Sequence, residues 1–134
     1  MAVYLLDTNA ISDAVRNPTG SVAIQIDRHR PEIVTSAIVE CELRSGIASK
    51  PESRVAARIG QFLDSLDILP FSSNATGHYG DIRAHLKTRG RPIGLMDTLI
   101  AAHCRSLDAC LVTHNVSDFT GIADLQVEDP LPKP

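Results

Sequence analysis

The sequence predicts an α/β fold: a three-layer α/β/α sandwich with a mainly parallel central sheet. Short apolar runs alternate along the chain with longer stretches of helical period, a pattern typical of parallel strands covered by helices on both faces. The 134 residues are 43% hydrophobic and 22% charged, which is a globular composition, and they contain no internal repeat. We therefore expect one domain over residues 1–134, with the proline-rich tail at 130–134 frayed.

The first half of the chain contains two predicted strands and four predicted helices. Four apolar residues at 3–6 predict a buried strand, which opens onto the polar triplet Asp7-Thr8-Asn9. Thr8 and Asn9 can cap the helix that we expect over residues 10–15. A short helix follows over 21–29, a strand over 33–35, a helix over 37–48 that Ser36 caps, and a helix from Pro51 to about residue 66.

The second half alternates in the same way. We expect a short strand at 68–69, a helix from residue 72 or 73 to 88, and a helix over 95–107. The turn residues Gly90-Arg91-Pro92 end the first of these helices. Residues 109–113 are the clearest later strand, and residues 126–127 are a candidate for the last one.

Composition also bears on compartment and partners. No apolar run is long enough to span a membrane and the amino terminus lacks the regions of a signal peptide, so we expect a cytoplasmic protein. Cys41, Cys104 and Cys110 form no Cys-x-x-Cys pair, and we interpret them as reduced packing residues. The formal net charge of -3 becomes +1 when the four acids described next are left out. Net charge therefore argues neither for nor against a nucleic-acid substrate.

Asp7 and Glu42 are the first two candidate functional residues. Asp7 follows the first strand, at the edge where open α/β sheets place their ligands. Glu42 shares a helix face with Ile38 and Gly46, and the small residues there predict that this face is buried. A buried glutamate requires a cation or a hydrogen-bond donor. The structural alternatives are a helix start at Asp7 and a partner such as Arg44, or simple exposure, for Glu42.

Asp97 and Asp118 are the other two candidates. Asp97 lies in the first turn of the helix over 95–107 and heads an apolar stripe that continues through Ile100, Ala101 and Cys104. An aspartate that only satisfies the helix dipole would normally face solvent instead. Asp118 follows the strand that ends at residue 113, and its structural alternative is a turn residue that caps the next segment.

The four acids lie in four short stretches of sequence. These are Leu5-Leu6-Asp7-Thr8-Asn9; Val39-Glu40-Cys41-Glu42-Leu43-Arg44-Ser45-Gly46; Pro92-Ile93-Gly94-Leu95-Met96-Asp97 with Leu99-Ile100-Ala101-Ala102; and Leu111-Val112-Thr113-His114-Asn115 with Asp118-Phe119. In register, they resemble the four motifs of the PIN domain, over residues 3–119. Order, spacing and length are most similar to the VapC-type toxins of bacterial toxin–antitoxin pairs, especially the FitB-like branch. His114 and the proline-rich tail are mild departures.

The resemblance implies a metal-dependent endoribonuclease that hydrolyses RNA phosphodiester bonds with a metal-activated water, as the toxin of a VapBC-type pair. Asp7 and Asp97 would be the principal ligands of Mg²⁺, for which Mn²⁺ can substitute. Glu42 would be a ligand through water or the orienting base, and Asp118 would complete a second site. The implied partners are a second copy of the chain and a VapB-type antitoxin that places an arginine against the acids. Water or the scissile phosphate would be positioned by Thr8, Asn9, Thr113 and Asn115.

Two alternative functions stay open: a PIN-like RNA-processing nuclease outside a toxin–antitoxin pair, and a non-catalytic domain that binds a partner. A receiver domain would need paired acids after the first strand, and a haloacid-dehalogenase-type phosphatase would need Asp-x-Asp, whereas Asn9 stands at that position. The histidines show no zinc-binding spacing and are expected on surfaces or helix faces. The basic stretch 87–91 fits a solvated helix end and a phosphate-backbone contact equally well.

Overall fold

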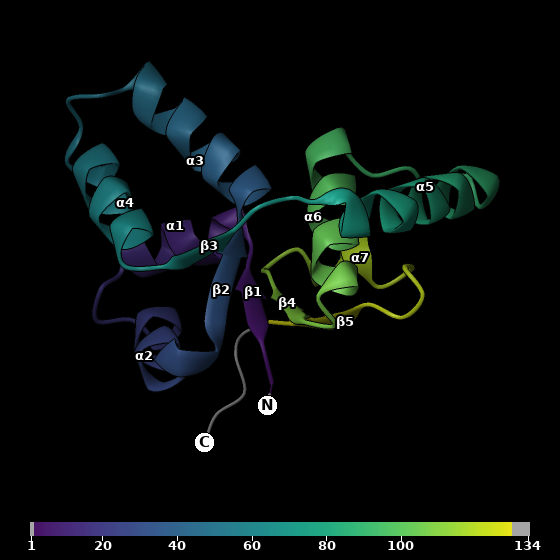
Figure 1. The fold of residues 1–134 in the computed structure, drawn as a ribbon. Helices are drawn as coiled ribbons and strands as arrows, with labels where there is room; N and C mark the ends of the chain where they lie inside the picture. The colour runs from purple at the N-terminus through teal and green to yellow at the C-terminus, as the bar shows by residue number, and fades with distance from the viewer. Residues whose placement is uncertain (1, 130–134) are drawn as a thin grey trace.

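The computed structural model describes residues 2–129 and contains one five-stranded sheet in the order β3-β2-β1-β4-β5. All four strand pairings are parallel. Helices cover both faces of the sheet (Figure 1), so the predicted three-layer α/β/α architecture is confirmed. The strands are β1 (Tyr4–Leu6), β2 (Ile33–Ser36), β3 (Asp67–Leu69), β4 (Cys110–Val112) and β5 (Gln126–Glu128).

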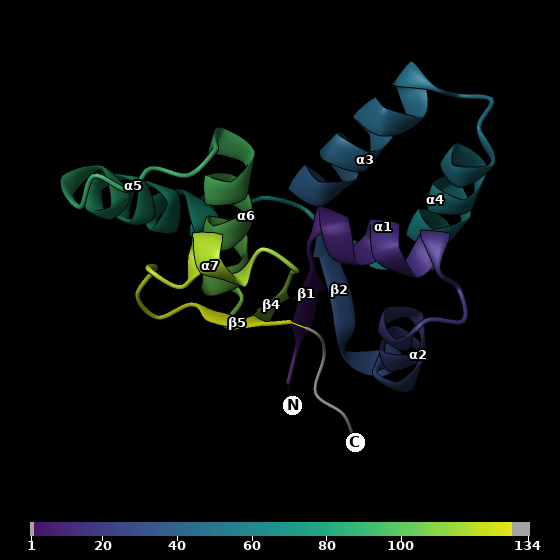
Figure 2. The ribbon, with the colours of Figure 1, turned by 180° about the vertical axis from the view of Figure 1, so that it is seen from behind.

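Helices α1 to α4 lie on one side of the sheet, and α5 to α7 lie on the other (Figure 2). Helix α1 packs against α2, α3 and α4, and α5 packs against α6. Helix α3 also contacts α6 and therefore reaches from one layer toward the other. The helices are α1 (Thr8–Arg16), α2 (Ser21–Arg28), the short 3₁₀ helix η1 (Arg30–Glu32), α3 (Ala37–Ser49), α4 (Arg54–Asp64), α5 (Ser73–Thr88), α6 (Leu95–Ser106) and α7 (Val116–Phe119).

Strand β1 is the centre of the sheet and sets the position of the candidate site. Leu5 and Leu6 are fully buried between the two helical layers. Leu6 lies opposite Thr35 of β2 and Val112 of β4. Because side-by-side parallel strands end at the same edge, the residues that follow in β1 and β4 come to lie together at the carboxyl edge. The backbone N–H of Asp7 donates to the Val112 carbonyl at 2.9 Å and extends this pairing by one residue.

Two helix starts differ from the predicted ones and one short helix is additional, each for a local reason. Helix α1 begins at Thr8, two residues early, because Asp7 is its N-cap and accepts from the Thr8 N–H. Helix α4 begins at Arg54, after Pro51, because the Ser53 hydroxyl caps it by accepting from the Ala56 N–H. The single-turn helix α7 was not predicted, since four residues are too few to show a helical period.

The prediction for the cysteines is right at two positions and wrong at one. Cys104 and Cys110 are buried packing residues, and burial raises the pKa of the Cys110 thiol to about 12. Cys41 is exposed, because α3 turns Val39 and Leu43 toward the core instead. The residues expected to fray, 130–134, lie outside the described residues.

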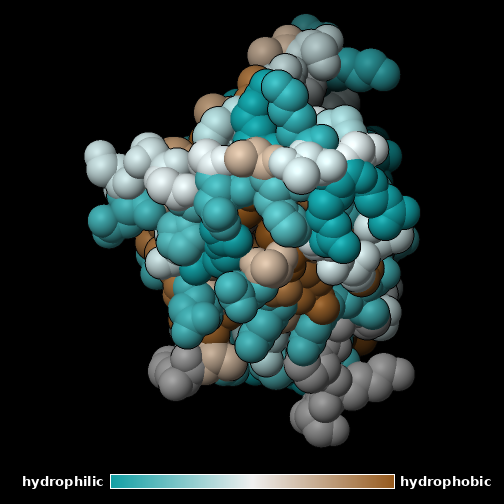
Figure 3. Space-filling view, turned by 90° about the vertical axis from the view of Figure 1, so that its right-hand side faces the viewer, coloured by the Kyte–Doolittle hydropathy of each residue, from teal (hydrophilic) through white to brown (hydrophobic). Residues whose placement is uncertain are grey.

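The molecular surface is mixed in character. Seen from the side of α5, a small apolar area is framed by hydrophilic side chains (Figure 3). Within residues 2–129, no helix combines the length and the apolar character that a membrane crossing requires.

Candidate functional site

Asp7 combines a structural task with a chemical one. Its side chain is only 3% exposed, and its Oδ1 accepts from the Thr8 N–H at 2.7 Å as the cap of α1. Its Oδ2 accepts from the Thr113 hydroxyl at 2.8 Å. Burial raises the pKa of Asp7, the two hydrogen bonds oppose that change, and the nearby charge of Glu42 adds to it. Asp7 is therefore a buried acid with a fixed orientation.

Thr113 fixes that orientation from the end of β4. Its hydroxyl is buried and accepts from the Asn9 Nδ2 and from the Asn115 N–H, both at 3.1 Å, while it donates to Asp7. Asn9 in turn accepts through its Oδ1 from the His114 N–H at 2.9 Å. The start of α1 and the segment after β4 are therefore joined by a polar network that ends on a carboxylate oxygen.

Glu42 reaches the same edge of the sheet from α3. The Thr8 hydroxyl donates to its Oε1 at 2.6 Å, so its partner is at the start of α1 and not Arg44, which pairs with Glu40. Glu42 is half-buried. The prediction that Ser45 and Gly46 lie on a buried face is wrong, because both are exposed and a side-chain carbon built on Gly46 would meet nothing within 4 Å.

Asp97 faces the other acids from the first turn of α6. It is half-buried, and the stripe that it heads is the buried one, since Ile100, Ala101 and Cys104 are all inaccessible. Within residues 2–129 its carboxylate has no hydrogen bond or ion pair. Burial first, and then the negative charges of Asp7, Glu42 and Asp118, raise the pKa of Asp97 to about 6. Asp97 thus lies within electrostatic reach of the other three acids.

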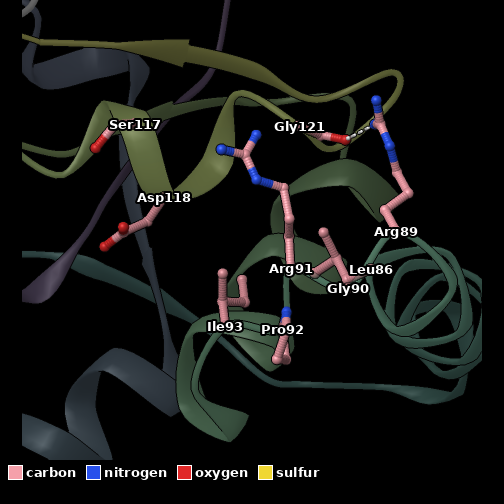
Figure 4. Close-up of a pocket in the computed structure, with 9 residues that line it drawn as sticks. All are labelled: Leu86, Arg89, Gly90, Arg91, Pro92, Ile93, Ser117, Asp118 and Gly121. Atoms are coloured by element: carbon pink, nitrogen blue, oxygen red, sulfur yellow. Dashed lines mark hydrogen bonds between the residues drawn. The ribbon is translucent and has the colours of Figure 1, made fainter.

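Asp118 lies at the margin of this group. It is exposed on α7 and lines a pocket of about 490 Å³ together with residues from the end of α5 and the loop before α6 (Figure 4). Asn115, at the N-cap of α7, is exposed, and only its backbone N–H bonds to the network around Thr113. The side chains of Thr8, Asn9 and Thr113 are bonded to protein groups, so the structure gives them an orienting task toward Asp7 and Glu42.

The donor set suits a hard cation with oxygen ligands. An unpartnered half-buried carboxylate that faces three like charges is the environment in which a divalent cation is favourable. Within the described range 2–129, no three Asp, Glu, His or Cys side chains are arranged as a ready ligand set. Mg²⁺ does not need one, because it is typically held by one or two carboxylates and retains several waters.

Two histidines make contacts that the sequence does not predict. His103 lies on a face of α6, which is among the expected positions, but it is only 2% exposed, and its Nδ1 lies 2.6 Å from the hydroxyl of Ser36, the N-cap of α3. Its flanks, Ala102 and Cys104, were the available signal, since a histidine amid small apolar residues favours burial. His114 lies beside the site, next to Thr113, and both of its ring nitrogens bond to carboxylates, Asp13 at 2.8 Å and Asp129 at 2.6 Å.

Comparison with known proteins agrees with this geometry. The model of the PIN domain family matches residues 4–125. A tRNA(fMet)-specific endonuclease VapC from Shigella flexneri is 33% identical over 131 residues, which cover 96% of this chain and 98% of that protein. The structure of VapBC2 from Rickettsia felis bound to a promoter DNA fragment is similar, with a TM-score of 0.88, 32% identity, and coverage of 95% of this chain and 98% of that one. FitAcB from Neisseria gonorrhoeae has a TM-score of 0.81 and 29% identity, with coverage of 96% and 98%.

Proposed function

Because this chain belongs to the PIN domain family and, within it, to the VapC ribonucleases, we propose that it is a divalent-cation-dependent endoribonuclease, the toxin of a VapBC-type toxin–antitoxin pair. The observation that carries the proposal is Asp97: a half-buried carboxylate without a partner among the described residues, in the electrostatic reach of three other acids. A merely structural aspartate would be paired or fully solvated.

Asp7 and Asp97 are the proposed ligands of Mg²⁺ or Mn²⁺. When bound, the cation would supply Lewis-acid stabilisation of the phosphoryl charge and a more acidic water. The bonds from Thr8 and Thr113 hold the Asp7 carboxylate in one orientation, which is what a ligand to a geometrically demanding ion requires. Asp7 is the N-cap of α1, and Asp97 lies in the first turn of α6. Both proposed ligands are therefore held by helix ends and not by a loop.

Glu42 is the proposed acceptor for the proton of the attacking water. Its Oε1 accepts from Thr8, which holds the carboxylate toward the start of α1 and leaves Oε2 without a described partner. Asp118, exposed on α7 and close enough to affect the pKa of Asp97, is proposed to complete a second cation position or to bear on the substrate. Asn115, also exposed, is the proposed contact to the substrate phosphate from the same segment.

The proposed partner is an antitoxin of the VapB type. The similar structures from Rickettsia felis and Neisseria gonorrhoeae are complexes named VapBC2 and FitAcB. An arginine from such a partner would pair with the acids that have no cationic partner among residues 2–129, and a guanidinium binds carboxylates in a bidentate manner. We also propose a homodimer and action in the cytoplasm, where RNA and antitoxin are available. Light scattering of the chain alone and of the co-expressed pair tests the assembly.

Cleavage of RNA by the purified chain tests the function. We expect hydrolysis with Mg²⁺ or Mn²⁺, none with a chelator, and none for Asp97→Asn in any of these conditions. Asp64→Asn is the matched control, because Asp64 is an exposed aspartate at the far end of α4 and should retain wild-type cleavage. Cleavage that persists in chelator, or an Asp97→Asn variant as active as wild type, would overturn the proposal.

A further inference from the structure

A pocket of about 490 Å³ adjoins the acidic group and is not used by the chemistry proposed above. It lies between the end of α5, the loop before α6, and α7. Asp118 and Ser117 form the wall on the side of α7, while Arg89 and Arg91 come from the opposite side (Figure 4). The pocket adjoins the acidic group, because its lining residue Ile93 lies just before the first turn of α6, which carries Asp97, and its lining residue Asp118 is one of the four acids.

The backbone holds Arg91 at the pocket through the end of α5. Gly90 has a φ of +66°, its N–H donates to the Lys87 carbonyl at 3.1 Å, and the Arg91 N–H donates to the Leu86 carbonyl at 3.0 Å. These two bonds and the left-handed glycine form a Schellman motif, which defines the path of the chain after a helix. Pro92 follows and restricts the next backbone angle. Arg91 is therefore presented by a fixed turn, although its side chain is exposed.

The two arginines of the pocket differ in what they already bind. Arg89 donates to the Gly121 carbonyl at 3.1 Å and so ties the loop after α7 to α5 (Figure 4). Arg91 has no side-chain hydrogen bond or ion pair within residues 2–129. By contrast, Arg105 of α6 is committed to Asp81, His78 and the Ala123 carbonyl. Among these three arginines, Arg91 alone keeps its full set of donors available for a ligand.

The size and lining of the pocket suit a nucleotide. Its volume lies within the range of about 300–1,000 Å³ that is usual for small-molecule sites. Leu86, Pro92 and Ile93 provide apolar surface, and Arg91 provides a guanidinium that can bind a phosphate or stack on a base. A base inside a duplex could not enter such a pocket, whereas an unpaired base can.

We propose that this pocket is a subsite for one nucleotide of unpaired RNA beside the scissile bond, and that the Arg91 guanidinium binds the phosphate of that nucleotide. The assignment rests on the nuclease function proposed above. RNA is favoured over a protein ligand because the pocket shares Asp118 with the acidic group, so a strand whose scissile phosphate lies at Asp97 can continue directly into the pocket. Arg91 is thus a positioning residue for the substrate.

RNA binding by an uncleaving protein tests the subsite independently of the chemistry. In an Asp97→Asn background, Arg91→Gln is compared with Arg83→Gln, which removes the same charge from an exposed position on α5 outside the pocket. The probe is a labelled single-stranded RNA, together with copies in which one phosphate at a time is replaced by a neutral methylphosphonate. We expect Arg91→Gln to weaken binding about tenfold and to reduce the salt dependence by about one counterion, with a much smaller change for Arg83→Gln.

The methylphosphonate series locates the contact. At one position the neutral linkage should weaken binding to the Asp97→Asn protein but leave binding unchanged once Arg91 is replaced. Equal effects of Arg91→Gln and Arg83→Gln, additive effects at every linkage, or an Arg91→Gln variant that loses only a co-expressed protein partner would each overturn the subsite. Failure of the nuclease proposal is distinct, because it would show as an absence of metal-dependent cleavage by the wild-type chain.

Discussion

The hydroxyl of Thr113 donates a 2.8 Å hydrogen bond to Oδ2 of Asp7, and it joins two residues that are 106 positions apart in the sequence. The bond favours the ionised form of Asp7, because a donor stabilises a carboxylate more than a carboxylic acid. Burial has the opposite effect on the same group and is the larger of the two. The ionisation of the proposed metal ligand therefore depends on a neighbouring strand.

Replacement Thr113→Val should move the acid limb of the cleavage pH profile to higher pH. Without the donor, the pKa of Asp7 rises further above its ordinary value of 3.8, so the ionised ligand forms at higher pH. Loss of a hydrogen bond to a charged group should also cost about 1.5–3 kcal/mol of stability. Thr35→Val is the matched control, because the Thr35 hydroxyl is equally buried but donates to the Leu6 carbonyl. An unshifted acid limb in Thr113→Val would contradict this account.

Replacement Asp97→Asn should leave the metal-free protein at neutral pH as stable as wild type or more stable. The pKa of Asp97 is about 6 in the folded chain against 3.8 ordinarily, so wild-type stability falls as the pH rises between these values and stays lower above them. Asparagine lacks this penalty, which is at most about 3 kcal/mol and is reduced by solvent screening. Urea denaturation in chelator, from acid to neutral pH, measures the difference.

Replacement Asp81→Asn should change the free energy of unfolding in the opposite direction in the same urea denaturation experiment. The hydrogen bond and charge of Arg105 lower the pKa of Asp81, so its ionised form stabilises the fold above the unfolded pKa and this stabilisation is lost on acidification. A clear loss of stability for Asp97→Asn at neutral pH would assign Asp97 an ordinary capping role. A gain from Mg²⁺ that is as large in Asp97→Asn as in wild type would lead to the same conclusion.

His114 should stabilise the fold most at mildly acidic pH. Burial opposes the shift, but the hydrogen bonds to Asp13 and Asp129 outweigh it and raise the pKa of His114 above 6.5. The stabilisation is therefore complete below the unfolded pKa and is lost as the pH rises through the folded value. The denaturation midpoint of His114→Asn should fall below that of wild type at low pH and approach it at high pH. A difference that grows with pH would exclude protonated His114 as the link between α1 and the end of β5.

Two glycines of the same helix region should respond to alanine in opposite ways. Gly90→Ala places a side chain at a φ of +66° and should destabilise the chain by about 1–2 kcal/mol. Gly77→Ala lies in the exposed interior of α5, where the new carbon meets nothing within 4 Å, and should stabilise by up to about 1 kcal/mol. Thermal melts of the two variants measure both effects. A neutral Gly90→Ala would show that the Schellman motif does not constrain Arg91.

The fold, and the proximity of the other three acids to Asp97, could be predicted from the sequence because their signals are local. The apolar run before Asp7 is a few consecutive residues, and the apolar stripe after Asp97 follows a few consecutive helical turns. Both are buried as expected. The hydrogen-bond partners could not be predicted in the same way. The sequence predicts Thr8 as a helix cap, whereas Asp7 is the N-cap and the Thr8 hydroxyl donates to Glu42. The partner of Thr8 depends on the position of α3, which the local sequence does not give.

The errors have a related cause. The small size of Gly46 predicts a buried face, but small size permits close packing without requiring it, and the buried residues of α3, which packs against α4, are Val39 and Leu43 instead. For His103 the sequence predicts a surface or a helix face and misses its burial, because the Ser36 hydroxyl satisfies the ring in the interior. In both cases the deciding contact comes from an element that is distant in the sequence.

The order of strands has a consequence for synthesis of the protein. Tyr4 of β1 pairs with Cys110 of β4. The central strand therefore cannot pair with this neighbour until almost the whole chain has left the ribosome. During translation the emerging half holds Asp7 and Glu42 but neither Asp97 nor the Thr113 hydroxyl that orients Asp7. Pairing at such long separation is also slow once it becomes possible. The nascent polypeptide therefore carries no assembled group of four acids while it is still attached to the ribosome.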